Sequence, residues 1–291
     1  MKKILYAILG VIAIVLTAHP MSILDNIEIS ANAEIDMPEI SGAVDNLPWT
    51  NNKKFIKAQK KSGTSVLMAA YCSVFNEPSP SEEFNVHLAA DSIAGIVVEP
   101  NEMFSQNNTI GPYDEKKGYK AGQSYFGSEI IPTVGGGVCN IATTLYNVSV
   151  SSNLEIVERF NHFMPVSYVP LGQDATVAYG SKDFKFKNNN EFPILIWAEG
   201  IGNRLFIALY GKEEPPCVQW HHKTLKKFEA PKVYKTNPDL PKGKEQIVVE
   251  GMEGASVESW LTITTPDGET KTKHMGTSQY WPRPQVIEIN E

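Results

Sequence analysis

The chain has 291 residues, of which 42% are hydrophobic and 20% charged, which is enough for one substantial core and a small second unit. The formal net charge is −7, and the sequence pI lies near 5.5. A general nucleic-acid-binding protein needs a basic face to neutralise phosphates, so the composition argues against that class and predicts no nucleic-acid partner.

The first residues have the layout of an export signal. Lys2 and Lys3 precede an apolar run over residues 4–18, typical of a secretory signal or a short membrane anchor over residues 1–18. The run is shorter than the roughly 20 residues of a spanning helix, which favours a signal. No small-x-small cleavage site lies directly after it, so cleavage and anchoring both stay open, with a membrane contact if the segment is uncleaved. Either way, the sequence predicts an exported protein.

Residues 19–69 are polar and irregular, with prolines at 20, 38 and 48, and predict a linker with local structure. The lysines between residues 53 and 61 are interpreted as a solvated face, with contact to a wall polyanion or anionic lipid as the alternative.

A helix is predicted to begin at Ser79. Serine is a good N-cap, Pro80 suits the first helical position, and Glu82 completes a capping box. Gly95 is placed to end this helix. His87, beside its apolar positions, is interpreted as a packing residue rather than a catalytic one.

The most informative stretch is IIPTVGGGVCNIATTLYNV, residues 130–148. Glycines 135–137 leave Cys139 open to close approach, and the apolar spacing that follows places this cysteine in or just before the first turn of a helix. A helix N-terminus favours the reactive thiolate. The same residues also fit a structural cysteine after a tight turn. A phosphate-binding loop is disfavoured, because no Lys-Ser/Thr pair follows the glycines.

The segments around this motif predict an α+β fold. The glycine- and tyrosine-rich connection of residues 107–130 is interpreted as a substrate-lining loop. Downstream, residues 154–158 and 183–187 predict strands, and the two apolar runs around residues 200–203 predict a hairpin.

Three cysteines cannot all pair within one chain. A bridge between Cys72 and Cys217 and a fully reduced set both remain open. Cys217, His221 and His222 match no common zinc spacing, so no metal site is predicted.

The motif GGGVCNIATTLYNV, followed by LEIVERFNHFMPVSYVPLGQDATVAYG, resembles the VanW-like domain of bacterial surface proteins, named for a protein of vancomycin-resistance clusters. The likeness covers about residues 71–211, and we assign residues 70–216 to this domain. It implies a mixed helix and sheet fold with a nucleophilic cysteine at a helix N-terminus. Some members are implicated as L,D-transpeptidases, which cross-link peptidoglycan stem peptides through diamino acids. No cofactor is implied, because the energy of the broken amide is retained in a thioester.

Residues 217–291 are assigned to a linker and a small β module. Strand-like stretches are separated by glycines and a Pro-Asp-Gly turn at residues 266–268. This tail resembles the G-five module of surface proteins, which implies binding to wall saccharide. A purely structural cap is the alternative.

The resemblance assigns roles to three residues. Cys139 is the predicted nucleophile. His162 matches the family's histidine and is the predicted base, while Asp174 is predicted to orient its imidazole. The alternatives are that His162 caps a strand end and that Asp174 organises a turn.

The predicted substrate and oxyanion set is Gly136, Gly137, Val138, Asn140 and Gln173. Backbone N–H groups around Cys139 would bind the oxyanion. Asn140 stands where glutamine is common in the family. Gln173 stands where arginine is common, which removes a bidentate partner for a substrate carboxylate.

The resemblance thus implies an L,D-transpeptidase acting on stem peptides at the outer face of the cytoplasmic membrane or in the cell wall of a Gram-positive-type bacterium. A wall-associated binding or scaffold protein with a structural cysteine is one alternative. A cysteine hydrolase with water as the acceptor is the other.

Overall fold

The computed structural model describes residues 37–126 and 129–290. The predicted signal or anchor of residues 1–18 lies outside these ranges. Within them, every helix is too short or too polar to cross a membrane.

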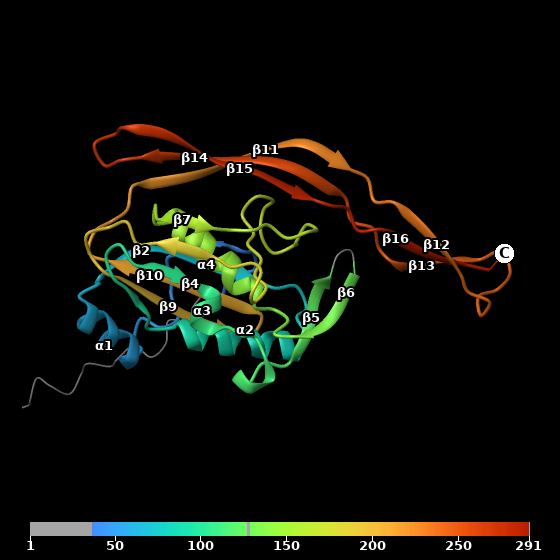
Figure 1. Ribbon diagram of the computed structural model, residues 1–291, viewed down its shortest axis with the longest axis horizontal. Coiled ribbons are helices and arrows are strands. Elements are labelled where there is room, and N and C mark those ends of the chain that lie inside the picture. Colours follow the sequence, from blue (N-terminus) through green and yellow to red (C-terminus); the bar gives the residue numbers. More distant parts are fainter. Residues whose placement is uncertain (1–36, 127–128, 291) are drawn as a thin grey trace, which may run out of the picture. The chain divides into compact units, whose positions relative to one another are not determined.

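In the described ranges the central sheet has five antiparallel strands (Figure 1). In spatial order they are β1 (Gly42–Ala43), β2 (Val66–Val74), β10 (Arg204–Gly211), β9 (Ile194–Ile201) and β3 (Val97–Val98). The predicted hairpin at residues 200–203 is confirmed, because β9 and β10 pair directly across it.

Both faces of this sheet are buried, as the side chains of β10 show. Leu205, Ile207 and Leu209 belong to one apolar core, while Phe206 and Tyr210 belong to a second core. Successive side chains of a strand point to opposite faces. The sheet therefore needs cover on both sides, which helices supply.

Two helices contact the sheet on the side of the first core, α2 (Pro80–Ile93) and α4 (Cys139–Ser151). The predicted capping box of α2 is confirmed: the Glu82 amide donates to Ser79 Oγ at 3.3 Å, and the Ser79 amide donates to Glu82 Oε2 at 2.8 Å. The helix ends at Ile93 with Ala94 as its C-cap, next to the left-handed Gly95.

The second core is covered by part of the segment predicted as a linker. Its helix α1 (Lys53–Ser62) buries Phe55, whose ring lies 5.1 Å from that of Trp197. Trp49 Nε1 donates to the Tyr210 hydroxyl at 2.9 Å. These two aromatic residues attach the segment to the sheet, while the predicted solvated lysines are exposed.

The connection before the cysteine motif contains short elements. They are α3 (Gln106–Ile110), the single turn η1 (Glu115–Lys117) and the hairpin strands β5 (Ala121–Phe126) and β6 (Glu129–Val134). A small sheet beside α4 has the order β4 (Met103–Ser105), β8 (Lys185–Lys187) and β7 (Glu155–Glu158).

The C-terminal region is all β, as predicted, and forms two three-stranded sheets. The first contains β11 (Cys217–Phe228), β14 (Gly254–Thr264) and β15 (Thr270–Tyr280), and the second contains β12 (Lys232–Thr236), β16 (Gln285–Ile289) and β13 (Glu245–Val249). Leu261 and Ile263 of β14 belong to the first core, and Trp220 of β11 lies 5.7 Å from the ring of Tyr146 in α4. The first C-terminal sheet therefore shares a core with the preceding α+β domain.

Replacing Phe206 with alanine should lower the free energy of unfolding by about 3–5 kcal/mol, because the side chain is fully buried and leaves a cavity. Chemical denaturation of the variant measures this loss. Ile40→Ala is the matched control, since Ile40 is 82% exposed. Equal stability of the two variants would contradict the assignment of Phe206 to the core.

Candidate active site

The glycine turn before α4 is shaped by close backbone approach. Gly135 and Gly137 have φ of +85° and +100°, a region that favours glycine. A Cβ on Gly136 would lie 2.3 Å from the carbonyl carbon of Gly122 in β5. The turn can therefore lie against the β5–β6 hairpin, and α4 begins at Cys139 itself.

Cys139 lies in the wall of a pocket of about 610 Å³. His162 and Thr176 line the same pocket, together with aromatic side chains that include Tyr113 and Tyr168. The connection of residues 107–130 also contributes to this wall, which is the position its predicted substrate-lining role requires.

The structure brings together the three residues predicted for catalysis. The Cys139 thiol forms a side-chain hydrogen bond with the His162 imidazole and lies 3.3 Å from Thr176 Oγ1. On the other side of the ring, His162 Nδ1 lies 2.7 Å from Asp174 Oδ2. The His162 backbone N–H donates to the same oxygen at 2.6 Å. The imidazole thus lies between a thiol and a buried carboxylate.

The pKa shifts in this set have opposite signs. Burial would raise the pKa of the Cys139 thiol, but hydrogen bonding and attraction to His162 outweigh burial, so this pKa is lowered. Burial would lower the pKa of His162, but its partners Asp174 and Cys139 raise this pKa to about 9. Both shifts act in favour of a thiolate beside an imidazolium, the form of a cysteine that attacks carbonyl groups.

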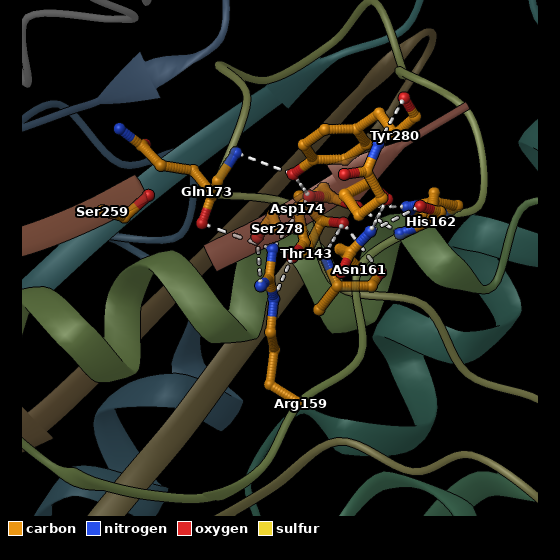
Figure 2. Close-up of polar contacts among 12 residues, drawn as sticks. Thr143, Arg159, Asn161, His162, Gln173, Asp174, Ser259, Ser278 and Tyr280 are labelled. Atoms are coloured by element: carbon orange, nitrogen blue, oxygen red, sulfur yellow. Dashed lines mark hydrogen bonds and ion pairs between the residues drawn. The ribbon is translucent and has the colours of Figure 1, made fainter. Parts of the chain in front are cut away.

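Asp174 is 1% exposed and has several partners (Figure 2). Arg159 Nη2 donates to Oδ1 at 2.9 Å, and the Tyr280 hydroxyl donates to the same oxygen at 2.5 Å. Burial would raise the pKa of this carboxyl group, but His162 and Arg159 lower it. The carboxylate is therefore charged and oriented when the imidazole is protonated.

The predicted substrate and oxyanion set is divided by the structure. Gly137, Val138 and Asn140 line the pocket. The Val138 and Asn140 N–H groups already donate to Gly135 and Gly137 carbonyls in the turn, at 3.2 and 2.9 Å. Among the three N–H groups predicted for the oxyanion, the Cys139 N–H is the one without a described acceptor.

Gly136 and Gln173 do not line the pocket. The Gly136 carbonyl accepts from Asn85 Nδ2 at 2.9 Å, which ties the glycine turn to α2. The Gln173 side-chain amide lies 2.8 Å from His222 Nε2 in the C-terminal sheet, and Gln173 is absent from the residues lining the pocket. Asp174 and Gln173 are adjacent in sequence, but Asp174 bonds His162 whereas Gln173 bonds His222.

The three cysteines are all free thiols, so the possible bridge between Cys72 and Cys217 is not formed. Cys72 is fully buried in β2, and burial raises its pKa to about 12. Cys217 is exposed at the start of β11. Within the described residues, no group of His, Cys, Asp and Glu side chains is arranged to hold a metal ion.

Sequence reasoning missed four residues of the site: Thr143, Arg159, Thr176 and Tyr280. Thr143 Oγ1 bonds both the N–H and the C=O of Ala175 at 3.0 Å, which holds the backbone directly after Asp174 against α4. Arg159 stands three positions before His162, and this proximity was the one available signal. Tyr280 lies 106 residues after Asp174, and nothing in the sequence connected it with the site.

Comparison with known families matches residues 81–210 to the VanW-like proteins and residues 221–290 to the G5 domain. The chain therefore carries a VanW-like domain followed by a G5 domain, as the sequence resemblance implied.

Two relatives share the first of these regions. The chain is 40% identical over 146 residues to the uncharacterized protein YoaR of Bacillus subtilis, covering 50% of this chain and 48% of YoaR. It is 25% identical over 165 residues to the vancomycin B-type resistance protein VanW of Enterococcus faecalis, covering 53% of this chain and 60% of that protein. The chain thus spans less than two thirds of each of these relatives.

Solved G5 structures also match a quarter of the chain. The IgA1 protease G5 domain is 24% identical with a TM-score of 0.18, covering 27% of this chain and 95% of that domain. HP0197-G5 is 15% identical with a TM-score of 0.16, covering 25% and 96%. At these TM-scores the likeness supports no structural conclusion.

Cys139 should react with iodoacetamide at pH values well below the ordinary thiol pKa of about 8.5, because its lowered pKa leaves it as thiolate there. Reactivity should fall only when the pH drops through this lowered pKa. Peptide mass spectrometry across the pH range in a Cys217→Ser background measures the rate, and buried Cys72 serves as the internal control. A half-maximal rate near the ordinary thiol pKa would contradict the pairing with His162.

Proposed function

We propose that this protein is a cysteine-dependent acyltransferase of the cell wall, an L,D-transpeptidase that cross-links peptidoglycan stem peptides. The observation that supports this most directly is the Cys139, His162 and Asp174 arrangement in the wall of one pocket, with the thiol and imidazole pKa values shifted in opposite directions. A structural cysteine needs no such partners.

In the acylation step, the Cys139 thiolate attacks the carbonyl carbon of the diamino acid at the third position of the donor stem. The negative charge moves to the carbonyl oxygen, near the Cys139 N–H. The imidazolium of His162 then gives its proton to the departing amine. The amide bond breaks, D-alanine leaves, and a thioester to Cys139 remains.

In the second step, the side-chain amine of a neighbouring stem attacks the thioester. Neutral His162 takes the proton from this amine, the new amide forms, and the thiolate is restored. The bond energy passes from amide to thioester to amide, so no nucleotide is consumed. Asp174 keeps the imidazole in the orientation that serves both steps.

The pocket wall has groups suited to a zwitterionic peptide. Lys182 supplies a cation for a substrate carboxylate, while Glu77 and Asp114 supply carboxylates for an amine. Because Gln173 bonds His222, we assign the recognition of a donor carboxylate to Lys182 and not to position 173. This division matches a donor that carries a terminal carboxylate and an acceptor that carries an amine.

The VanW-like and G5 domains support a location at the cell surface. Export to the outer face of the cytoplasmic membrane or to the wall would bring the pocket to its proposed substrate. A role in glycopeptide resistance belongs to the Enterococcus relative by name, and transpeptidation is the activity we propose for this chain.

Incubation of the soluble protein with disaccharide tetrapeptide should give a cross-linked dimer and free D-alanine, both detected by mass spectrometry. Cys139→Ala should abolish both products, because the thioester cannot form. Thr144→Ser is the matched control, since Thr144 is buried on the same helix, is absent from the pocket wall, and would keep a hydroxyl for its bonds to Ser73 Oγ and the Asn140 carbonyl.

The products separate the competing functions. Shortened monomers without dimers would replace the transferase with a hydrolase, in which water attacks the thioester. The scaffold function would be favoured if the protein binds the wall but gives no Cys139-dependent product. This test uses stem peptides with each of the two common diamino acids.

A second candidate function, binding of wall saccharide, is favoured by exposed aromatic side chains where the end of the G5 region contacts the segment after His162. Phe163 is 46% exposed and Trp281 is 48% exposed, with ring centroids 6.4 Å apart at an interplanar angle of 27°. The ring of Phe228 lies 5.8 Å from that of Trp281. Flat apolar rings that face solvent suit the apolar faces of sugar rings.

Trp281→Ala should reduce co-sedimentation of the protein with purified peptidoglycan sacculi by about tenfold in affinity, the loss expected when roughly 1.4 kcal/mol of contact is removed. Tyr234→Ala in β12 is the control, since Tyr234 is 54% exposed and lies outside this aromatic group. Equal loss in both variants, or in neither, would remove the aromatic group as the binding surface.

A further inference from the structure

The segment of residues 159–174, which carries His162 and Asp174, is attached to the G5 region along its length. Asn161 Nδ2 donates to the Gln279 carbonyl at 2.8 Å, and the Trp281 N–H donates to the Phe163 carbonyl at 2.7 Å. These bonds lie on both sides of His162 in sequence. The backbone that presents the imidazole is therefore held by the end of β15.

The far end of the same segment lies against the G5 sheet through Gly172. Its φ is +95°, and a Cβ there would lie 2.3 Å from Ser259 Oγ of β14. The Gly172 N–H donates to the Tyr280 hydroxyl at 2.7 Å. A side chain at position 172 would separate the segment from the sheet, so the contact depends on this glycine.

Two side chains of β15 complete the shell around the Asp174 carboxylate (Figure 2). The Tyr280 hydroxyl accepts from Gly172, so its own proton is directed to Asp174 Oδ1. Ser278 Oγ accepts from Arg159 Nη1 at 2.8 Å, while Arg159 Nη2 holds the same carboxylate oxygen as Tyr280. Tyr280 is fully buried and Ser278 is 3% exposed, so water does not compete for these bonds.

We propose that Tyr280, from the G5 region, is a positioning residue of the active site: its hydroxyl holds Asp174 in the orientation that pairs with His162. The G5 region then belongs to the catalytic unit in addition to any wall contact. This inference rests on the proposed function of Cys139, His162 and Asp174.

The charged and titratable groups around Asp174 determine how the loss of the Tyr280 hydroxyl affects the carboxylate. His162 and Arg159 face the carboxylate directly, Tyr146 lies under the guanidinium, and Cys139 lies beyond the imidazole. Without Tyr280, Oδ1 keeps Arg159 alone as a described side-chain partner, and the carboxylate gains freedom to rotate. A less fixed carboxylate holds the imidazolium less well, so the thiolate loses its counter-charge.

The experiment compares the pH profile of Cys139 alkylation in the whole protein, wild type and Tyr280→Phe, in the Cys217→Ser background. We expect the low-pH limb of the profile to move up by about one pH unit, which is about a tenfold slower reaction at a pH below the wild-type midpoint. Tyr234→Phe, in the same region but exposed, should match the wild type. Ser278→Ala, acting through Arg159, should move the limb in the same direction by less.

The outcomes distinguish the two proposals. A wild-type profile with an ordinary thiol midpoint would overturn the paired cysteine and histidine, and with it the proposed function. A lowered wild-type midpoint that stays unchanged in both Tyr280→Phe and Ser278→Ala would overturn the positioning role alone. Near-ultraviolet circular dichroism shows whether each variant is folded, and if Tyr280→Phe is not, Ser278→Ala decides. The positioning role would be supported if Tyr280→Phe raises the alkylation midpoint and lowers kcat for cross-linking while KM stays near the wild-type value.

Discussion

The candidate active site depends on one buried negative charge, the carboxylate of Asp174. Removing a partner from a buried ion pair typically costs about 3–5 kcal/mol, because the remaining charge is left without compensation. Asp174 avoids this cost through an arginine, an imidazole, a backbone N–H and a phenol. These partners come from two regions of the chain, so a single charge links the VanW-like domain to the G5 domain. The pairing of Cys139 with His162 depends on this charge, because a buried imidazolium is stable only beside a counter-charge such as the Asp174 carboxylate.

The sequence predicted what local rules determine. The capping box at Ser79 and the hairpin at residues 200–203 rest on interactions a few residues apart, and both are present. The all-β character of the C-terminal region follows from its turn residues and strand-like stretches, and it is present too. The glycine run also has a local reason, since its left-handed backbone and close approach to Gly122 leave little choice of residue. Such features can be read from one sequence because neighbours in the chain suffice to define them.

Contacts between segments far apart in the chain could not be predicted from the sequence. Residues 19–69 were predicted as a linker because they are polar, contain several prolines and lack a sustained apolar period, but Trp49 and Phe55 attach part of this segment to the sheet. Gln173 was expected at the substrate, yet its amide bonds His222, a residue 49 positions away. The direction of a side chain depends on which surface packs against its strand, and no spacing rule encodes that.

The placement of Tyr280 also sets an order of assembly. If the chain is exported from its N-terminus, as proposed, Cys139 and His162 would reach the outer side of the membrane before residue 280 does. Until then the shell around Asp174 lacks its phenol, and the thiol lacks its full electrostatic environment. The shift of the Cys139 thiol pKa would be complete only after Tyr280 has packed beside Asp174. Because thiolates react faster than thiols, the C-terminal position of Tyr280 would delay the full reactivity of Cys139 until the chain is complete.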